Sequence, residues 1–249
     1  MTVHPAQPEV VEYAGGRLMD VHRPAGPPGP WPVVLLWHGR GPDERDVLHP
    51  LAREAAGLGL LVLVPDWRSD AEDGGRAHLL ASLAHARRHA AAYGGDPDRF
   101  VLAGWSMGGR EAVALATHPA TPAEERPTAA VGISSSYTNP ALTTGEAPLP
   151  LLTGRLSPVP LWLVHGTRDD LVPAERTREL NAALLKPAER FLEPDTDHAG
   201  TVLTEYDPAF NRCRPARAAH AVDAGRATAR LLAEAAGVPA GGSPAHPLG

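Results

Sequence analysis

The 249-residue sequence contains a single cysteine, Cys213, so no disulfide can form within the chain, which fits a reducing compartment. Its apolar runs, such as LGLLVLVP, are far shorter than the roughly 20 residues that cross a bilayer. The opening stretch, MTVHPAQPEVVEYAGG, lacks the basic start and the apolar run of a secretory signal. From these absences we expect a cytoplasmic protein with no membrane partner.

Positive charge is in deficit, with 23 lysines and arginines against 29 acidic residues and a formal net charge of -6. A chain of this charge has no general attraction for nucleic acid or for an anionic membrane. The sequence also lacks the G-x-x-x-x-G-K-[ST] phosphate-binding motif, the H-E-x-x-H zinc motif and any cysteine pair. We therefore expect a small-molecule partner and neither a metal nor an organic cofactor.

What the sequence does contain is a regular alternation of predicted strands and helices. VVLLWHG and LLVLVPDW are continuous apolar runs, typical of strands that are buried on both faces. We expect eight strands, at residues 10–14, 17–24, 33–39, 60–67, 99–105, 129–137, 160–167 and 190–194. We expect helices at residues 46–58 and 76–93, after Ser106, from near Pro173 and at 215–236. This pattern predicts an α/β fold with a mostly parallel central sheet of about eight strands flanked by helices.

The chain shows no internal repeat and no change of composition that would mark a second domain. We expect an N-terminal tail at residues 1–9, one α/β domain at 10–237 and a disordered C-terminal tail at 238–249. Residues 138–158 lack a helical period and are a candidate short lid or pocket loop. This segment is too short for a large cap domain, which predicts a fairly open cleft.

One motif carries chemistry: GWSMGG, residues 104–109, places Ser106 between an expected strand and an expected helix. A serine at so tight a turn has a strained backbone, and side chains at Gly104 and Gly108 would collide with neighbouring segments. The N-terminus of the helix supplies unpaired N–H groups beside the hydroxyl. A serine that is merely small enough for a turn does not explain this strand–turn–helix placement, which is that of a nucleophile elbow.

A serine hydroxyl is a poor nucleophile at neutral pH, so it needs a base and a group that orients the base. Two later loops offer candidates for this base and for the group that orients it. TRDDLVP, at the end of the strand at 160–167, contains Asp169 and Asp170, and DTDHAG, after the strand at 190–194, contains His198. The order serine, acid, histidine is the chain order that a nucleophile elbow requires. Of the 12 histidines, His198 alone follows the last expected strand in a loop long enough to fold back over Ser106.

Four segments, LLWHGRG, GWSMGG, HGTRDDLVP and DHAG, make the chain resemble the α/β-hydrolase fold superfamily. The resemblance runs from about residue 10 to 237 and is strongest to the small esterase and dienelactone-hydrolase-like branches. In that family an H-G-x-x-D-x-x-V-P segment commonly carries the catalytic acid at its aspartate, which implies Asp169, with Asp170 as the alternative. The implied triad is Ser106, His198 and Asp169.

An oxyanion hole needs two backbone N–H donors. One is expected at Met107, directly after the serine. The resemblance implies that the other is Arg40, in the loop after the upstream HG strand. This loop reads HGRG, where many lipases and esterases have HGGG. We expect the Arg40 side chain either to contact substrate or to pair with Asp43 or Glu44.

The resulting hypothesis is a serine hydrolase that cleaves small to medium carboxylic esters through an acyl-enzyme. Aromatic residues near the expected strand ends, Trp67, Trp105 and Tyr137, are candidates for the pocket wall. A peptidase or amidase, a thioesterase and a lactonase would use the same triad, so these activities remain alternatives. A non-catalytic binding protein on this fold is a further alternative, which the complete triad disfavours.

Overall fold

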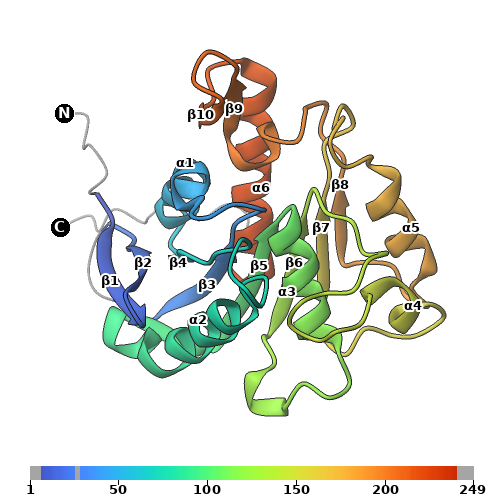
Figure 1. Ribbon diagram of the computed structural model, residues 1–249, viewed down its shortest axis with the longest axis horizontal. Coiled ribbons are helices and arrows are strands. Elements are labelled where there is room, and N and C mark those ends of the chain that lie inside the picture. Colours follow the sequence, from blue (N-terminus) through green and yellow to red (C-terminus); the bar gives the residue numbers. More distant parts are fainter. Residues whose placement is uncertain (1–6, 26–28, 240–249) are drawn as a thin grey trace.

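A sheet of eight strands forms the centre of the protein in a computed structural model that describes residues 7–25 and 29–239 (Figure 1). The strand order across the sheet is β1-β2-β4-β3-β5-β6-β7-β8. These strands are β1 (Glu9–Ala14), β2 (Arg17–His22), β3 (Trp31–Trp37), β4 (Leu61–Pro65), β5 (Gly95–Trp105), β6 (Ala129–Ile133), β7 (Leu161–Val164) and β8 (Arg190–Leu192). The pairs β1–β2 and β2–β4 are antiparallel, and every pair from β4 to β8 is parallel. The predicted α/β fold is confirmed.

Helices flank this sheet on both faces (Figure 1). The α-helices are α1 (Arg45–Gly57), α2 (Arg76–His89), α3 (Met107–Thr117), α4 (Pro148–Leu152), α5 (Glu175–Ala183) and α6 (Ala219–Ala235). Three short 3-10 helices are η1 (Ala90–Tyr93), η2 (Ala123–Glu125) and η3 (Gly200–Val202). α1 and α6 share a core with β3 to β7, whereas α2 shares a second core with β2 to β5. The two cores lie on opposite faces, because each uses alternate residues of the same strands.

The apolar runs of the sequence serve both cores at once. In β3, Val34 and Leu36 belong to the core of α1 and α6, whereas Val33 and Leu35 belong to the core of α2. All four side chains are fully buried. A strand covered on both faces is apolar at every position, which is why VVLLWHG lacks the alternation of a half-exposed strand.

The C-terminal part differs from the predicted order of elements. The helix expected from residue 215 begins at Ala219, and a two-stranded hairpin of β9 (Thr204–Asp207) and β10 (Arg212–Pro215) precedes it. Pro215 is compatible with the first turn of a helix, but here it is the last residue of a strand that pairs on one side only. The helix prediction is therefore wrong for residues 215–218.

Within residues 138–158 the chain forms the short helix α4. Leu152 of α4 is buried in a third core cluster that also contains Val113 of α3 and Leu180 of α5. The segment is thus tied to the main domain at α4. Its action as a lid stays a prediction.

The expected tails fall mostly on residues 1–6 and 240–249, which lie outside the described residues. Glu9, expected in the N-terminal tail, is the first residue of β1. No helix in residues 7–25 or 29–239 is both long enough and apolar enough to span a bilayer.

Candidate active site

Four loops leave the sheet at the same edge, because β3, β5, β7 and β8 all run in the same direction. These loops carry Arg40, Ser106, Asp169 and His198, respectively. In open α/β sheets, ligands bind beyond the carboxyl ends of the strands. The structure therefore brings together four segments that lie far apart in the sequence.

Ser106 occupies the sharp turn between β5 and α3. Its backbone has φ 55° and ψ -121°, a conformation that costs a non-glycine residue about 1–3 kcal/mol. Two neighbours on the next strand and its loop hold it: the Ser106 N–H donates to the Ile133 carbonyl at 2.8 Å, and the Ser135 hydroxyl donates to the Ser106 carbonyl at 2.6 Å. The strained turn is thus fixed by hydrogen bonds on both sides of the serine.

Glycines let the chain pass close to this turn. A Cβ atom on Gly104 would lie 2.2 Å from the Gly108 carbonyl oxygen, and one on Gly108 would lie 2.4 Å from the His38 carbonyl oxygen. A Cβ atom on Gly39 would lie 3.1 Å from the Cβ atom of Ser106. Backbone atoms cannot move aside as the end of a side chain can, so Gly104 and Gly108 of the GWSMGG motif are required by packing.

Ser106 and His198 line one cleft of about 550 Å³, which Arg40 and Met107 also line. Within the described part of the chain, no hydrogen bond joins the Ser106 hydroxyl to His198, whose Nδ1 bonds to Asp169. Such bonds are often long in unliganded sites and tighten when substrate binds. The cleft is of the size that small-molecule sites have.

His198 and Asp169 are joined directly. The Nδ1 atom of His198 lies 2.6 Å from Oδ2 of Asp169, and the two residues are only 6% and 8% exposed. An ionised carboxylate can only accept, so Nδ1 carries the proton and Nε2 is left as the basic nitrogen. Trp105 braces the imidazole: its ring lies 4.8 Å from that of His198, and its Nε1 donates to the His198 carbonyl at 3.1 Å.

The carboxylate of Asp169 is held by donors on both oxygens. Oδ1 accepts the backbone N–H groups of Leu171 and Val172, at 3.1 and 2.8 Å. Burial alone would raise the pKa of Asp169, but hydrogen bonds from His165 and His198 outweigh burial and hold this pKa well below its usual range. Asp169 is therefore a fixed anion across the physiological pH range.

Asp170, the alternative acid, has a different environment. It is exposed and lines a neighbouring hollow beside Trp105 and Tyr206. Among the described residues the hydrogen bond from His198 goes to Asp169. The geometry thus favours Asp169 over Asp170 as the partner of the histidine.

A second histidine contacts the same carboxylate. His165 is fully buried at the end of β7, with Nε2 3.2 Å from Oδ2 of Asp169. The motifs that point to Ser106, Asp169 and His198 assign no role to His165. The signal that identifies it is the four-residue spacing in HGTRD, which lets the loop fold back and place His165 beside Asp169.

The loop after β3 is clamped to the loop after β4 on both sides of Arg40. Gly41 donates its N–H to the Ser69 hydroxyl at 3.0 Å and accepts the Ser69 N–H at 3.1 Å. The Trp67 indole N–H donates to the His38 carbonyl at 3.2 Å. Burial lowers the pKa of His38 to about 4, so its ring is neutral. These bonds fix the backbone that carries the Arg40 N–H.

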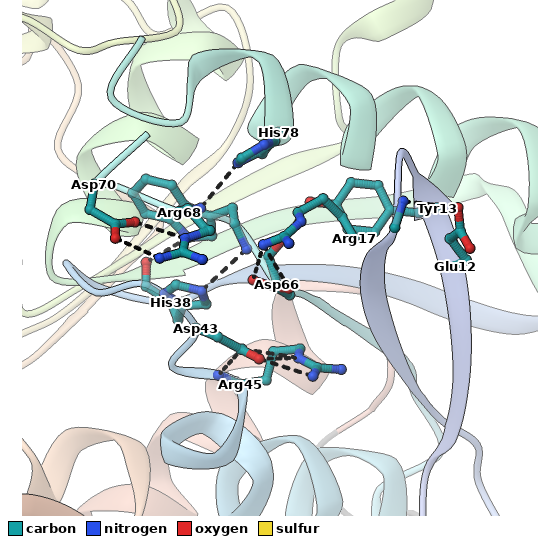
Figure 2. A network of polar contacts seen from close by, with 12 residues as sticks. Glu12, Tyr13, Arg17, His38, Asp43, Arg45, Asp66, Arg68, Asp70 and His78 are labelled. Carbon is teal, nitrogen blue, oxygen red and sulfur yellow. Dashed lines mark hydrogen bonds and ion pairs between the residues drawn. The ribbon is translucent and has the colours of Figure 1, made fainter. Parts of the chain in front are cut away.

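A network of polar contacts holds the far end of this loop, at the start of α1 (Figure 2). Arg45 contacts both oxygens of Asp43, from Nε and Nη2 at 3.0 Å each, and its Nη1 donates to Asp20 at 2.7 Å. Arg17 extends the network to Asp66 at 3.2 Å. Asp43, one of the alternatives considered for the Arg40 side chain, thus pairs with Arg45.

The aromatic candidates for the pocket wall separate into two groups. Trp105 is close to His198 and lines the hollow next to the cleft. Trp67 and Tyr137 are fully buried and belong to the cores of α2 and of α4 and α5, respectively. The prediction that Trp67 and Tyr137 line the pocket is corrected, because a strand end does not determine to which side the side chain points.

Among residues 7–25 and 29–239 there is no cluster of three or more His, Cys, Asp or Glu residues that could hold a metal ion. The buried acidic residues have other partners. Asp169 bonds to His198, and Asp20 bonds to Arg45.

The amino-acid sequence matches a family model and several known proteins. Residues 33–245 match the family model described as the alpha/beta hydrolase family. The uncharacterized protein Rv2307c of Mycobacterium tuberculosis is 31% identical over 208 residues, which cover 76% of this chain and 71% of that protein. LipM of the same organism, described as a probable carboxylic ester hydrolase, is 28% identical over 218 residues, which cover 72% of this chain and 48% of LipM.

Solved structures are similar over almost the whole chain. Esterase 2 of Thermogutta terrifontis, in a structure phosphorylated by paraoxon, superposes with a TM-score of 0.70. The match covers 93% of this chain and 94% of the esterase, at 21% sequence identity. At this identity the likeness concerns the fold.

Proposed function

The chain belongs to the alpha/beta hydrolase family, and from this premise we propose that it is a serine esterase acting on small to medium carboxylic esters. The observation that carries the proposal is the common cleft of Ser106 and His198, in which a 2.6 Å hydrogen bond to Asp169 fixes the imidazole. The similarity to a probable carboxylic ester hydrolase supports an ester as the substrate.

In the proposed mechanism, His198 Nε2 takes the proton of the Ser106 hydroxyl while the oxygen attacks the ester carbonyl. Asp169 holds the proton on Nδ1 and stabilises the imidazolium that forms. The imidazolium then gives its proton to the leaving alcohol. Water, activated by the same Nε2, hydrolyses the acyl-enzyme and restores Ser106.

The negative charge on the carbonyl oxygen needs two donors. Met107 is the first residue of α3, so its N–H has no acceptor within the helix. Arg40 offers the second N–H from a loop that is clamped at His38 and Gly41. Each donor of this kind contributes on the order of 10²–10³ to the rate.

The direct test is intact-mass measurement after treatment with a fluorophosphonate, which labels an activated serine. We expect one adduct on the wild-type chain and none on Ser106→Ala, with circular dichroism showing that both are folded. An unlabelled wild-type chain, or a labelled alanine variant, would rule out Ser106 as the nucleophile.

A second experiment tests which type of bond the protein hydrolyses. We expect turnover of 4-nitrophenyl esters with short acyl chains and little turnover of aminoacyl anilides, because an aniline is a poorer leaving group than 4-nitrophenolate. Thioesters and lactones are measured in the same panel. A higher kcat/KM for the anilides than for the esters would replace the esterase assignment with an amidase.

A further inference from the structure

Three arginines line the cleft of Ser106: Arg40 after β3, Arg110 in the first turn of α3 and Arg176 at the start of α5. No aspartate or glutamate occurs among the described residues that line it. The whole chain has a formal net charge of -6, so this concentration of positive charge is a local property of the cleft. Cationic side chains with no acid between them attract an anion.

The guanidinium of Arg110 has an incomplete set of partners. Its side chain is 14% exposed, and its only ion pair within the described residues is a 3.4 Å contact from Nε to Glu111. Glu111 is fully buried and already accepts the N–H groups of Leu142 and Thr143 and the Thr143 hydroxyl, at 2.9 to 3.1 Å. The terminal nitrogens of Arg110 are therefore available to a ligand in the cleft.

The other two arginines are also only loosely engaged. Arg176 pairs with Glu179 at 3.2 Å, and both side chains are 44% exposed, so the pair contributes little. The Arg40 side chain is exposed and forms no ion pair with residues 7–25 or 29–239. Neither cation is committed to a buried carboxylate, so each can contact a ligand at small cost.

We propose that the substrate is an ester that also carries a free carboxylate, which Arg110 and Arg176 bind while Ser106 attacks the ester carbonyl. The proposal rests on the serine esterase function proposed above. A guanidinium presents parallel N–H donors that match the two oxygens of a carboxylate. A cleft of about 550 Å³ accommodates a substrate with both groups. The carboxylate only binds: the ester C–O bond breaks, and the acyl group passes to Ser106 and then to water.

The test uses substrates that differ only in charge. With the charge on the acyl part, the mono-4-nitrophenyl ester of glutaric acid is compared with the 4-nitrophenyl ester of glutaramic acid. With the charge on the alcohol part, 4-acetoxybenzoate is compared with 4-acetoxybenzamide. After subtraction of spontaneous hydrolysis, kcat/KM is expected to be about tenfold higher for the anionic member of at least one pair.

Matched variants link the preference to the arginines. Arg110→Gln and Arg176→Gln are each expected to lower the anionic-to-neutral ratio of kcat/KM by about three- to tenfold, and the double variant to bring it near one. Arg178→Gln is the control: Arg178 lies on the same helix as Arg176 but pairs with Glu175 and Glu193 outside the cleft. This control keeps the wild-type ratio. Added salt lowers that ratio.

Equal kcat/KM values within both pairs, or an unchanged ratio in the double variant, overturn the proposal. The fluorophosphonate adduct is measured on the same samples. A chain that labels but shows no preference refutes the carboxylate site alone, whereas a chain that neither labels nor cleaves any ester refutes the esterase function. In the latter case, titration calorimetry with glutarate decides the site: binding that the double variant loses supports it, and no binding overturns it.

Discussion

The Nε2 atom of His165 lies 3.2 Å from Oδ2 of Asp169, the same oxygen that His198 contacts. His165 Nε2 also lies 2.7 Å from the Val172 carbonyl, which can only accept, so this nitrogen carries a proton. Its Nδ1 lies 2.7 Å from the Thr177 hydroxyl oxygen. His165 therefore acts as a donor that helps to hold the carboxylate in the position where it orients His198.

Removing this donor is expected to impair catalysis without impairing binding. In His165→Leu we predict a fall in kcat of about tenfold with little change in KM, because one hydrogen bond to a charged group is lost behind the catalytic histidine. His165→Gln keeps an N–H donor near Nε2 and should recover part of kcat. Steady-state kinetics on a neutral nitrophenyl ester measures kcat and KM of both variants. Equal activity of the leucine and glutamine variants would refute a positioning role for His165.

Substitutions of Asp169 and of its neighbour Asp170 are expected to have very different effects on kcat. Asp169→Asn should lower kcat by about 10⁴, the order found when a triad aspartate becomes an amide and the histidine loses its correct tautomer. Asp170→Asn, which changes an exposed side chain, should keep kcat within twofold. The measurement is kcat on the same ester for both variants. The reverse result, with the larger loss at Asp170, would reassign the acid.

The fold and the proposed reacting groups could be located from the sequence because their signals are local. GWSMGG marks a turn that only small neighbours allow, since a Cβ atom on Gly104 or Gly108 would lie 2.2 or 2.4 Å from a backbone oxygen. Asp169 and His198 follow predicted strands, and parallel strands bring their carboxyl ends to one edge. Chain order and strand direction thus suffice to place these segments together.

Contacts that depend on side-chain direction could not be predicted in this way. A Cβ atom on Gly132 would lie 2.0 Å from the Tyr137 hydroxyl, so Tyr137 points back into the core although it follows a strand end. The contact between Arg45 and Asp20 joins residues 25 positions apart on a helix and a strand. Neither residue type nor spacing indicates such a pair before the fold is known.

The ion pair between Arg45 and Asp20 is expected to stabilise the loop that carries Arg40. Arg45→Met leaves the carboxylate of Asp20 unpaired with its side chain only 12% exposed, and we predict a loss of about 2 kcal/mol in the free energy of unfolding. A several-fold fall in kcat should accompany it, because the loop loses its anchor at α1.

The double variant Asp20→Asn/Arg45→Met tests this explanation. It removes the charge that the single variant leaves unpaired, so it should be more stable than Arg45→Met alone. Urea unfolding curves measure the free energies of unfolding of the wild type, Arg45→Met, Asp20→Asn and the double variant. A double variant less stable than either single variant would show that the ion pair is not the reason for the loss.

The pH dependence of stability is expected to reflect His22, which is 4% exposed on β2 and whose Nε2 has no hydrogen-bond partner among the described residues. Burial, together with the nearby His49 and Arg53, lowers its pKa to about 3, against 6.5 in the unfolded chain. Between these values the unfolded state binds the extra proton, so the stability present above pH 6.5 is lost as the pH falls. The loss is about 2 kcal/mol between pH 6.5 and pH 5.

His22→Leu removes both the titration and the unpaired nitrogen. We predict that its free energy of unfolding exceeds that of the wild type at pH 5 and falls less steeply between pH 6.5 and pH 5. The exposed His220 provides the control, since His220→Gln changes a histidine that is solvated in both states and should keep the wild-type slope. Urea unfolding at several pH values gives the slopes. If His22→Leu kept the wild-type slope, another buried group such as His38, with its pKa of about 4, would carry the acid sensitivity.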